Sequence, residues 1–294
     1  MTAGADPLTT ADTRIQITRR TSRWDDRPAT VADAIDFWSF AAGAANVVMQ
    51  LALPPVGHGV AESTVTSGSL LHHPWKRART TFSYLAVAIL GTDDDKAAYR
   101  AAVDGAHRQV RSTPASPVKY NAFDRDLQMW VAACLYVGLE DTYQLLRGEL
   151  SPAQAEEFYR SGFTLGTTLQ VTDDQWPATR AEFDDYWNAA CARVAMDDTV
   201  RGYLTDLINL RMITPLLRPG HRMLLKFLTA GFLAPVFRDA LGLTWSPTRQ
   251  RLFEWLFLFV SLVNRFLPQF IRQGGSFLLL YDIRRRVRRG KALI

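Results

Sequence analysis

The sequence predicts an all-α protein organised as one multi-helix domain, and three observations support this prediction. First, no segment shows the sustained two-residue alternation of apolar and polar residues that marks a half-buried strand. Second, apolar residues recur at helical spacing through most of the 294 positions. Third, several of these segments follow a residue type that caps helices. We expect a polar, flexible N-terminal segment over 1–30 and a single helical domain over 31–294.

The helices predicted in the first half begin at recognisable signals. They are expected over 34–51, 75–90, 92–111 and 124–146. The second follows His73-Pro74, and proline favours the first turn of a helix. Thr92 caps the third, which carries aspartates at the positive end of its dipole, and Asp124 can cap the fourth.

Two Ser-Pro steps mark helix starts in the second half. Ser151-Pro152 is followed by Gln154, which completes a capping box. Ser246-Pro247 precedes a helix predicted over 248–270. Breaks or loops are expected over 166–177, 218–220 and 239–247.

Composition is typical of a globular protein from a reducing compartment. Hydrophobic residues make up 48% and charged residues 21%, which is too apolar for a disordered chain. The two cysteines, Cys134 and Cys191, form neither a disulfide framework nor a CxxC zinc motif. No apolar h-region follows the polar start, and the apolar segment 255–263 is too short to span a bilayer. We therefore expect a cytoplasmic protein.

The C-terminal tail is strongly basic. The cations that follow the last acid, Asp282, are Arg284, Arg285, Arg286, Arg288, Arg289 and Lys291. Because the whole chain carries +5, the rest of it is close to neutral. The tail is either a solvated helix end or a site of peripheral contact with anionic lipid, where each charge contributes about 1 kcal/mol. Aromatic residues do not interleave with these cations, so no nucleic-acid partner is expected.

Arg77 and Thr81 lie one turn apart on a helix that is largely apolar. An inward guanidinium needs an anion, and its forked donors suit a carboxylate or phosphate. The threonine hydroxyl beside it can donate to a bound oxygen species. The alternative is an arginine that reaches the surface and a threonine bonded to its own backbone.

His107 is surrounded by small Ala and Val residues at helical spacing. A neutral imidazole in such a setting can ligate a haem iron through one ring nitrogen. The alternative is a core histidine that is hydrogen-bonded to a backbone carbonyl.

Other polar residues of this region have two explanations each. Glu62 can act as a base if desolvation raises its pKa, or it is an exposed loop residue. His58 lies between two glycines, which predicts a flexible loop. His72 and His73 are adjacent and face different directions, so they form either a solvated pair or part of a site entrance.

Several catalytic signatures are absent from the sequence. It contains no HExxH, no P-loop, no GxSxG and no GxGxxG. Zinc proteases, P-loop NTPases, α/β-hydrolases and dinucleotide-binding enzymes are therefore not expected.

Four short sequence motifs follow one another along the chain. They are Arg77-x-x-x-Thr81, His107-x-x-Val, Tyr120-x-Ala-x-Asp and Trp130-Val. Their order and spacing resemble those of the MpaB-type oxygenases, which share a catalytic domain with the latex-clearing rubber oxygenases. Segments 228–238 and 241–245 look like later helices of that family, so the resemblance covers roughly 35–290.

The resemblance implies an all-α, globin-like core that holds haem b. Family members use ferrous iron and dioxygen to cleave carbon–carbon double bonds in isoprenoid chains. Carried over by motif, His107 would be the proximal iron ligand. Arg77 and Thr81 would lie by the haem on the distal side, and Glu62 would correspond to the family's acid.

The chain departs from the family at two positions. Ala132 stands where many relatives have a histidine after Trp-Val, and Thr80 stands where some rubber oxygenases place a lysine. The resemblance therefore predicts a haem site that depends on His107 and has a more open distal side.

The function predicted from these observations is a haem b-dependent oxygenase. Its expected partners are dioxygen and a hydrophobic isoprenoid or lipid-like molecule, and oxidative cleavage of a double bond is the expected chemistry. Two alternatives stay open: a haem or oxygen sensor without catalysis, and a haem-free helical lipid-binding protein.

Overall fold

The computed structural model describes residues 8–17, 29–63, 71, 73–211 and 218–294. Every regular element in these ranges is a helix, and the one β-type contact is an isolated bridge between Arg111 and Asn121. The all-α prediction is therefore confirmed. The comparison with a globin core stays a prediction.

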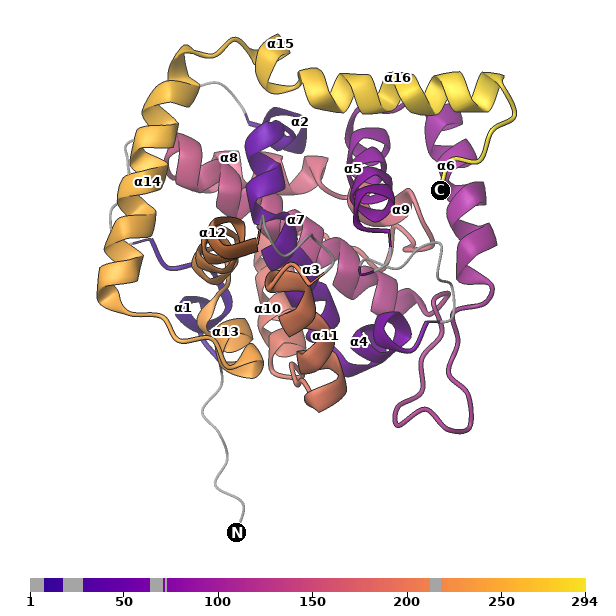
Figure 1. Cartoon of the computed structure of the whole chain (residues 1–294). Coiled ribbons are helices and arrows are strands. Elements are labelled where there is room, and N and C mark those ends of the chain that lie inside the picture. The colour runs from indigo at the N-terminus through magenta and orange to yellow at the C-terminus, as the bar shows by residue number, and fades with distance from the viewer. Residues whose placement is uncertain (1–7, 18–28, 64–70, 72, 212–217) are drawn as a thin grey trace.

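Figure 1 labels the helices along the chain. They are α1 (Thr10–Thr13), α2 (Val31–Ala34), η1 (Phe37–Ala42), α3 (Gly43–Leu51), α4 (Pro54–Ala61), α5 (Pro74–Leu90), α6 (Asp93–His107), α7 (Arg125–Arg147), α8 (Pro152–Ser161), α9 (Thr164–Thr167), α10 (Arg180–Cys191), α11 (Asp198–Ile208), α12 (Arg218–Gly231), α13 (Pro235–Leu241), α14 (Pro247–Phe266), α15 (Gln269–Arg272) and α16 (Gly274–Arg288).

Helix α7 runs through the centre of the fold (Figure 1). The carboxylate of Asp124 starts it by accepting hydrogen bonds from the backbone N–H groups of Asp126 (2.9 Å) and Leu127 (3.2 Å). Most of its residues are buried, and it packs against α2, η1, α3, α9 and α14. It ends at Gly148, whose φ of 91° favours glycine. The helix predicted over 124–146 is confirmed.

Helices α5, α6 and α16 form one side of the molecule (Figure 1). The predicted starts at Pro74 and Thr92 are confirmed, and Thr92 forms a capping box. Helix α6 ends at His107 rather than at 111, because the backbone N–H of Val110 turns back to the carbonyl of His107 (2.9 Å). Helix α16 packs mainly against α5, and its Arg284 binds Asp95 of α6 at 2.8 Å.

Some predicted bounds were wrong, for local reasons. The segment expected as one helix over 34–51 is broken at Asp36, whose carboxylate accepts from the N–H of Trp38 (3.0 Å) and begins η1. The break expected over 218–220 is the first turn of α12, which suits a proline. Helix α13 extends into the loop expected over 239–247 and ends at Gly242.

The N-terminal part expected to be flexible includes an anchored segment. The Nε atom of Arg14 donates to Asp141 of α7 at 2.9 Å, and its Nη2 atom also contacts Glu140. The indole of Trp187 donates to the carbonyl of Thr13 at 3.0 Å. Residues 8–17 therefore pack on the helical core, and the domain boundary expected at 31 stays a prediction.

No single helix among the described residues has the length and hydropathy needed to cross a membrane. The pair Phe37–Leu51 and Pro54–Ala61 reaches that hydropathy only together, across a bend of 109°.

Candidate functional site

His107 is the last residue of α6 and is half-buried. Its Nδ1 atom is buried and has no hydrogen-bond partner among the residues that the structure describes. The ring of Phe123 meets the imidazole edge-on, with ring centroids 6.2 Å apart. The carbonyl bond expected for an ordinary core histidine is therefore missing at Nδ1, and an unpaired buried nitrogen is costly unless a ligand occupies it.

The surroundings of His107 favour its neutral form. Burial lowers the pKa of the imidazole below its ordinary 6.5, and the positive charge of Arg77 lowers it further. The carboxylate of Asp104, one turn earlier on α6, opposes this effect. A neutral imidazole is the form that ligates a metal.

Arg77 lies on α5 close enough to His107 to act on its charge. Burial lowers the pKa of the guanidinium, and Tyr203 and Tyr99 oppose that effect. Within the described ranges the guanidinium forms no hydrogen bond and no ion pair. A half-buried arginine without a carboxylate partner among the described residues is suited to an anionic ligand.

The two threonines that follow Arg77 on α5 differ. Thr80 makes the local bond expected for a helical threonine, since its hydroxyl donates to the carbonyl of Lys76 at 2.9 Å. The phenol of Tyr99 donates to the carbonyl of Thr80 at 2.6 Å. Thr81 is half-buried, and among the described residues its hydroxyl has no such partner. Thr81 can therefore serve a ligand while Thr80 is engaged by its own helix.

Glu62 caps the C-terminus of α4 and has three side-chain partners. Its carboxylate accepts hydrogen bonds from Ser116 Oγ (2.7 Å) and Tyr120 Oη (3.1 Å), and Nδ1 of His58 lies 2.6 Å from it. The bond from Ser116 is the main reason why the pKa of Glu62 is lowered. Desolvation was one condition under which Glu62 could act as a base, but the pKa is lowered instead, because donors stabilise the carboxylate more than burial penalises it.

His58 was expected in a flexible loop, and this prediction was also wrong. It lies on α4, is only 3% exposed, and places its Nε2 atom 2.7 Å from Asp197. The glycine before it allows α4 to approach its neighbours closely, since a Cβ on Gly57 would lie 2.6 Å from the carbonyl oxygen of Leu51 and 2.8 Å from Val200. The imidazole therefore bridges two carboxylates, those of Glu62 and Asp197.

Asp197 joins this bridge from α11. It is the N-cap of that helix, and its carboxylate accepts from the N–H of Val200 at 3.0 Å. That bond is the main reason why the pKa of Asp197 is lowered. The sequence contains the capping signal, but nothing in it indicates that Asp197 meets His58. Ser116 was missed for the same reason.

The site therefore has two parts that share one loop. The first part, Arg77 with His107, lies between α5 and α6. The second, which we call the carboxylate–histidine bridge, consists of Glu62, His58 and Asp197. No hydrogen bond or ion pair within the described ranges joins the two parts directly. Both border the loop 108–124, which supplies Ser116, Tyr120 and Phe123.

A polar network supports the α6 end of this loop. The amide of Gln170 binds the carboxylate of Asp104 and the amide of Gln128. Gln128 also donates to the carbonyl of Ala122 at 2.8 Å. This network positions the carboxylate of Asp104, which opposes the lowering of the His107 pKa. It also joins the loop 108–124 to α7.

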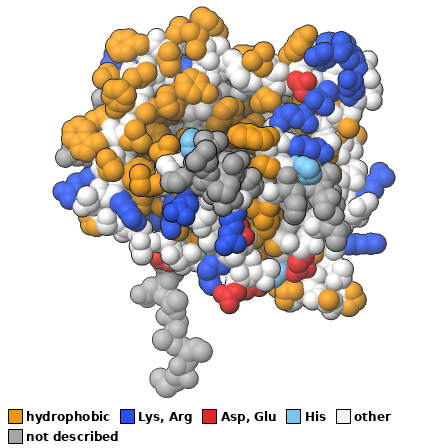
Figure 2. All heavy atoms as spheres, viewed as in Figure 1, with side chains coloured by type: hydrophobic (Ala, Val, Ile, Leu, Met, Phe, Trp, Pro, Cys, Tyr) orange, Lys and Arg blue, Asp and Glu red, His pale blue; other side chains and the backbone are white. Residues whose placement is uncertain are grey.

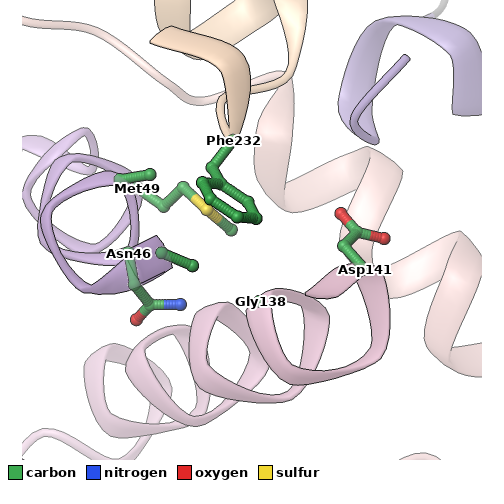
Figure 3. Close-up of a pocket in the computed structure, with 7 residues that line it drawn as sticks. Asn46, Met49, Gly138, Asp141 and Phe232 are labelled. Atoms are coloured by element: carbon green, nitrogen blue, oxygen red, sulfur yellow. The ribbon is translucent and has the colours of Figure 1, made fainter. Parts of the chain in front are cut away.

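A small cavity lies elsewhere, between α3, α7 and Phe232 (Figure 3). Its volume is about 10 Å³, which suits at most one water molecule. Beside it, the amide of Asn46 donates to the carbonyl of Cys134 at 2.6 Å. None of the predicted site residues lines it, so it is not the cofactor site.

The remaining predicted positions contribute little to this site. His73 is exposed at the start of α5, and Ala132 is buried in α7. His72 lies outside the described residues. In the described part of the chain, no three His, Cys, Asp or Glu side chains converge as a metal site would require. A haem iron bound by a single protein ligand does not need such a group.

Comparison with known proteins places this chain among oxygenases. A family model described as "ER-bound oxygenase mpaB/B'/Rubber oxygenase, catalytic domain" matches residues 32–262. The uncharacterized proteins Mb2261 of Mycobacterium bovis and Rv2237 of Mycobacterium tuberculosis are each 48% identical over 255 residues, covering 85% of this chain and 98% of the relative. No solved structure matches significantly.

Proposed function

Because the chain belongs to the family of mpaB and rubber oxygenase catalytic domains, we propose that it is a haem b-dependent oxygenase. Family membership establishes an oxygenase-type catalytic domain over 32–262. The proposed substrate is a hydrophobic isoprenoid or lipid-like molecule, as the name rubber oxygenase in the family description suggests. The proposed reaction is cleavage of a carbon–carbon double bond, with the two atoms of dioxygen ending in two carbonyl groups.

The observation that carries the proposal is the buried Nδ1 of His107, which has no hydrogen-bond partner in the described part of the chain, with the charge of Arg77 acting on the same ring. An imidazole held neutral by its surroundings is the form that would bind a haem iron, so His107 would hold the cofactor. A guanidinium without a carboxylate partner fits a haem propionate. Bound haem would supply the ferrous iron that binds and activates dioxygen.

Glu62 is the proton acceptor that we propose for this site. Its lowered pKa keeps it ionised near neutral pH, as a base must be before it accepts a proton. Nδ1 of His58 lies 2.6 Å from Glu62 Oε1, and Nε2 lies 2.7 Å from Asp197 Oδ2. A proton taken up by Glu62 can therefore pass through the imidazole toward Asp197, which lies nearer the solvent.

The absorbance spectrum of the protein, expressed with haem supplied, tests the cofactor assignment. We expect a Soret band that is lost in His107→Ala and kept in His73→Ala, a matched control at an exposed histidine. A colourless wild-type protein, or a band unchanged by His107→Ala, would contradict the assignment.

Oxygen uptake tests the catalytic part of the proposal. With a polyisoprenoid or an unsaturated lipid present, the haem-loaded protein should consume dioxygen and release carbonyl products. A stable complex with oxygen and no turnover would instead identify a sensor. A colourless protein that co-purifies with a prenyl lipid or fatty acid would identify a lipid carrier.

A further inference from the structure

Helices α14, α15 and α16 carry a large apolar surface on the outside of the molecule. Figure 2 shows hydrophobic side chains gathered over α14 and α15 and toward α16. Phe266 is 77% exposed, Phe270 72% and Leu278 70%. The surface formed by these three residues together with Leu252, Phe259 and Leu262 of α14 is called the outer apolar face below. Soluble proteins rarely expose a contiguous patch of this kind without a partner.

Packing into the core does not explain why the outward side of α14 is apolar. Leu252, Phe259, Leu262 and Phe266 recur at helical spacing on its exposed side. The opposite side of α14 packs into the core, and residues such as Phe253 and Phe257 are buried there. Helix α14 is therefore apolar on two sides, and only one of them packs against other residues that the structure describes.

The exposed charges on the segment 247–281, which carries most of the outer apolar face, have one sign. From 247 to 281 the sequence contains a single acid, Glu254, which is only 5% exposed. The exposed ionisable side chains of α14 are Arg249, Arg251 and Arg265. An apolar face whose exposed charges over 247–281 are all cationic matches the interface of a bilayer with anionic headgroups.

The basic tail supplies further cations beside this face. Arg284 binds Asp95 of α6 at 2.8 Å and so holds α16 to the body, whereas Arg286 binds Asp282 within α16 at 2.6 Å. The other four, which are exposed, are Arg285, Arg288, Arg289 and Lys291. Figure 2 shows the blue side chains at the C-terminal end of α16 on the same face of the molecule as the apolar side chains.

We propose that the outer apolar face is a docking surface for an anionic phospholipid bilayer. Its large side chains would enter the interface, and the arginines of α14 and the tail would meet the headgroups. A second copy of the chain fits less well, because a two-fold contact would place the same cations against each other. The proposal is independent of haem binding and needs no membrane-spanning helix.

Co-sedimentation of the full chain with lipid vesicles tests the proposal. We expect binding to vesicles of phosphatidylcholine with 30% phosphatidylserine, and at least tenfold weaker binding to phosphatidylcholine alone. Binding should weaken at high salt, because the headgroup attraction is screened. The apolar variant Phe259→Gln/Phe266→Gln and the basic variant Arg285→Gln/Arg288→Gln/Arg289→Gln should each bind anionic vesicles at least tenfold more weakly.

Matched controls lie away from the outer apolar face. Phe163→Gln removes an exposed phenylalanine between α8 and α9, and Arg193→Gln removes an exposed arginine after α10. Both should bind like the wild type, and circular dichroism should show that every variant is folded. No binding of the wild type to anionic vesicles, or equal losses in the controls, would overturn the proposal. It would also be overturned by a stable dimer in solution that Phe259→Gln/Phe266→Gln dissociates.

Discussion

Nε2 of His58 lies 2.7 Å from Oδ2 of Asp197, although 139 positions separate the two residues. The other ring nitrogen lies 2.6 Å from Glu62. One buried imidazole therefore connects α4 with the N-terminus of α11 and with the carboxylate that the loop 108–124 surrounds. This arrangement makes the carboxylate–histidine bridge a structural element as well as a candidate path for protons.

The structural role of the bridge predicts a loss of stability in His58→Ala. Removing the ring leaves a buried gap and takes a partner from two carboxylates, so the free energy of unfolding should fall by about 2–4 kcal/mol. Urea unfolding followed by circular dichroism measures this. His73→Ala, at an exposed position, should change it by less than about 0.5 kcal/mol. Equal effects in the two variants would show that the bridge does not stabilise the fold.

If Glu62 is the proton acceptor, replacing it should lower turnover and leave haem binding unchanged. Glu62→Gln keeps the side-chain size but cannot accept a proton, so kcat should fall by about 10²-fold or more while the Soret band stays. Asp197→Asn, at the far end of the bridge, should lower kcat by a smaller factor. Unchanged turnover in Glu62→Gln would exclude it as the base.

The lowered pKa values of Glu62 and Asp197 predict how stability depends on pH. Both carboxylates have a lower pKa in the folded state than in the unfolded chain. Their contribution should be fully present above the unfolded pKa of about 4–4.5 and be lost as pH falls through the lower, folded values. Unfolding free energies measured from pH 7 to pH 3 should decline less in Glu62→Gln than in the wild type. An equal decline would show that Glu62 is not a source of this dependence.

The charge relationship between Arg77 and His107 predicts a shift that can be measured without haem. Arg77 lowers the pKa of the imidazole, so Arg77→Gln should raise it toward 6.5. Asp104→Asn should lower it further, because that carboxylate acts in the opposite direction. Titration of the His107 ring protons by NMR in the haem-free protein measures both shifts. Arg79→Gln is the control, since Arg79 pairs with Asp282.

With the proposed haem site, the same pKa predicts the pH range over which haem should stay bound. Only the neutral ring can ligate iron, so protonation competes with the cofactor. Because the pKa of His107 is below 6.5, the Soret band of the wild type should persist when pH falls below 6.5. A band that disappears already above pH 7 would contradict this prediction.

The buried pairs of Arg14 predict a large loss of stability when it is truncated. Arg14→Ala leaves Asp141 without its guanidinium and Glu140 with fewer partners, and both lie in the core. The expected cost is about 3–5 kcal/mol, measured by urea unfolding. Arg160→Ala, which breaks an exposed pair with Glu156, should cost less than about 1 kcal/mol. Comparable costs for the two would show that the buried cluster does not anchor residues 8–17.

Local sequence signals were sufficient to predict the class of fold and most long helices. Asp124 and Thr92 cap α7 and α6 as expected, because an N-cap bond involves only the next few residues of the chain. The helix prediction failed where a local sequence signal had two interpretations. The glycines beside His58 were interpreted as loop residues, yet Gly57 serves close packing of α4 on α11.

The candidate site was predictable only in part. The motif spacing and the resemblance identified Arg77, Thr81, His107 and Glu62 as residues of interest. The direction of the Glu62 pKa could not be predicted, because it depends on Ser116 and on His58, which lie close only in the folded chain.

The sequence by itself determined an all-α chain and its main helix starts, because these depend on short-range periodicity and capping, and its motifs carried the resemblance to an oxygenase family. Only the tertiary structure decided which side chains meet. The buried Nδ1 of His107, the bridge from Glu62 to Asp197 and the exposed apolar side of α14 all depend on how distant helices pack. Burial and hydrogen bonding then determine the charge of each group, and no local pattern encodes them.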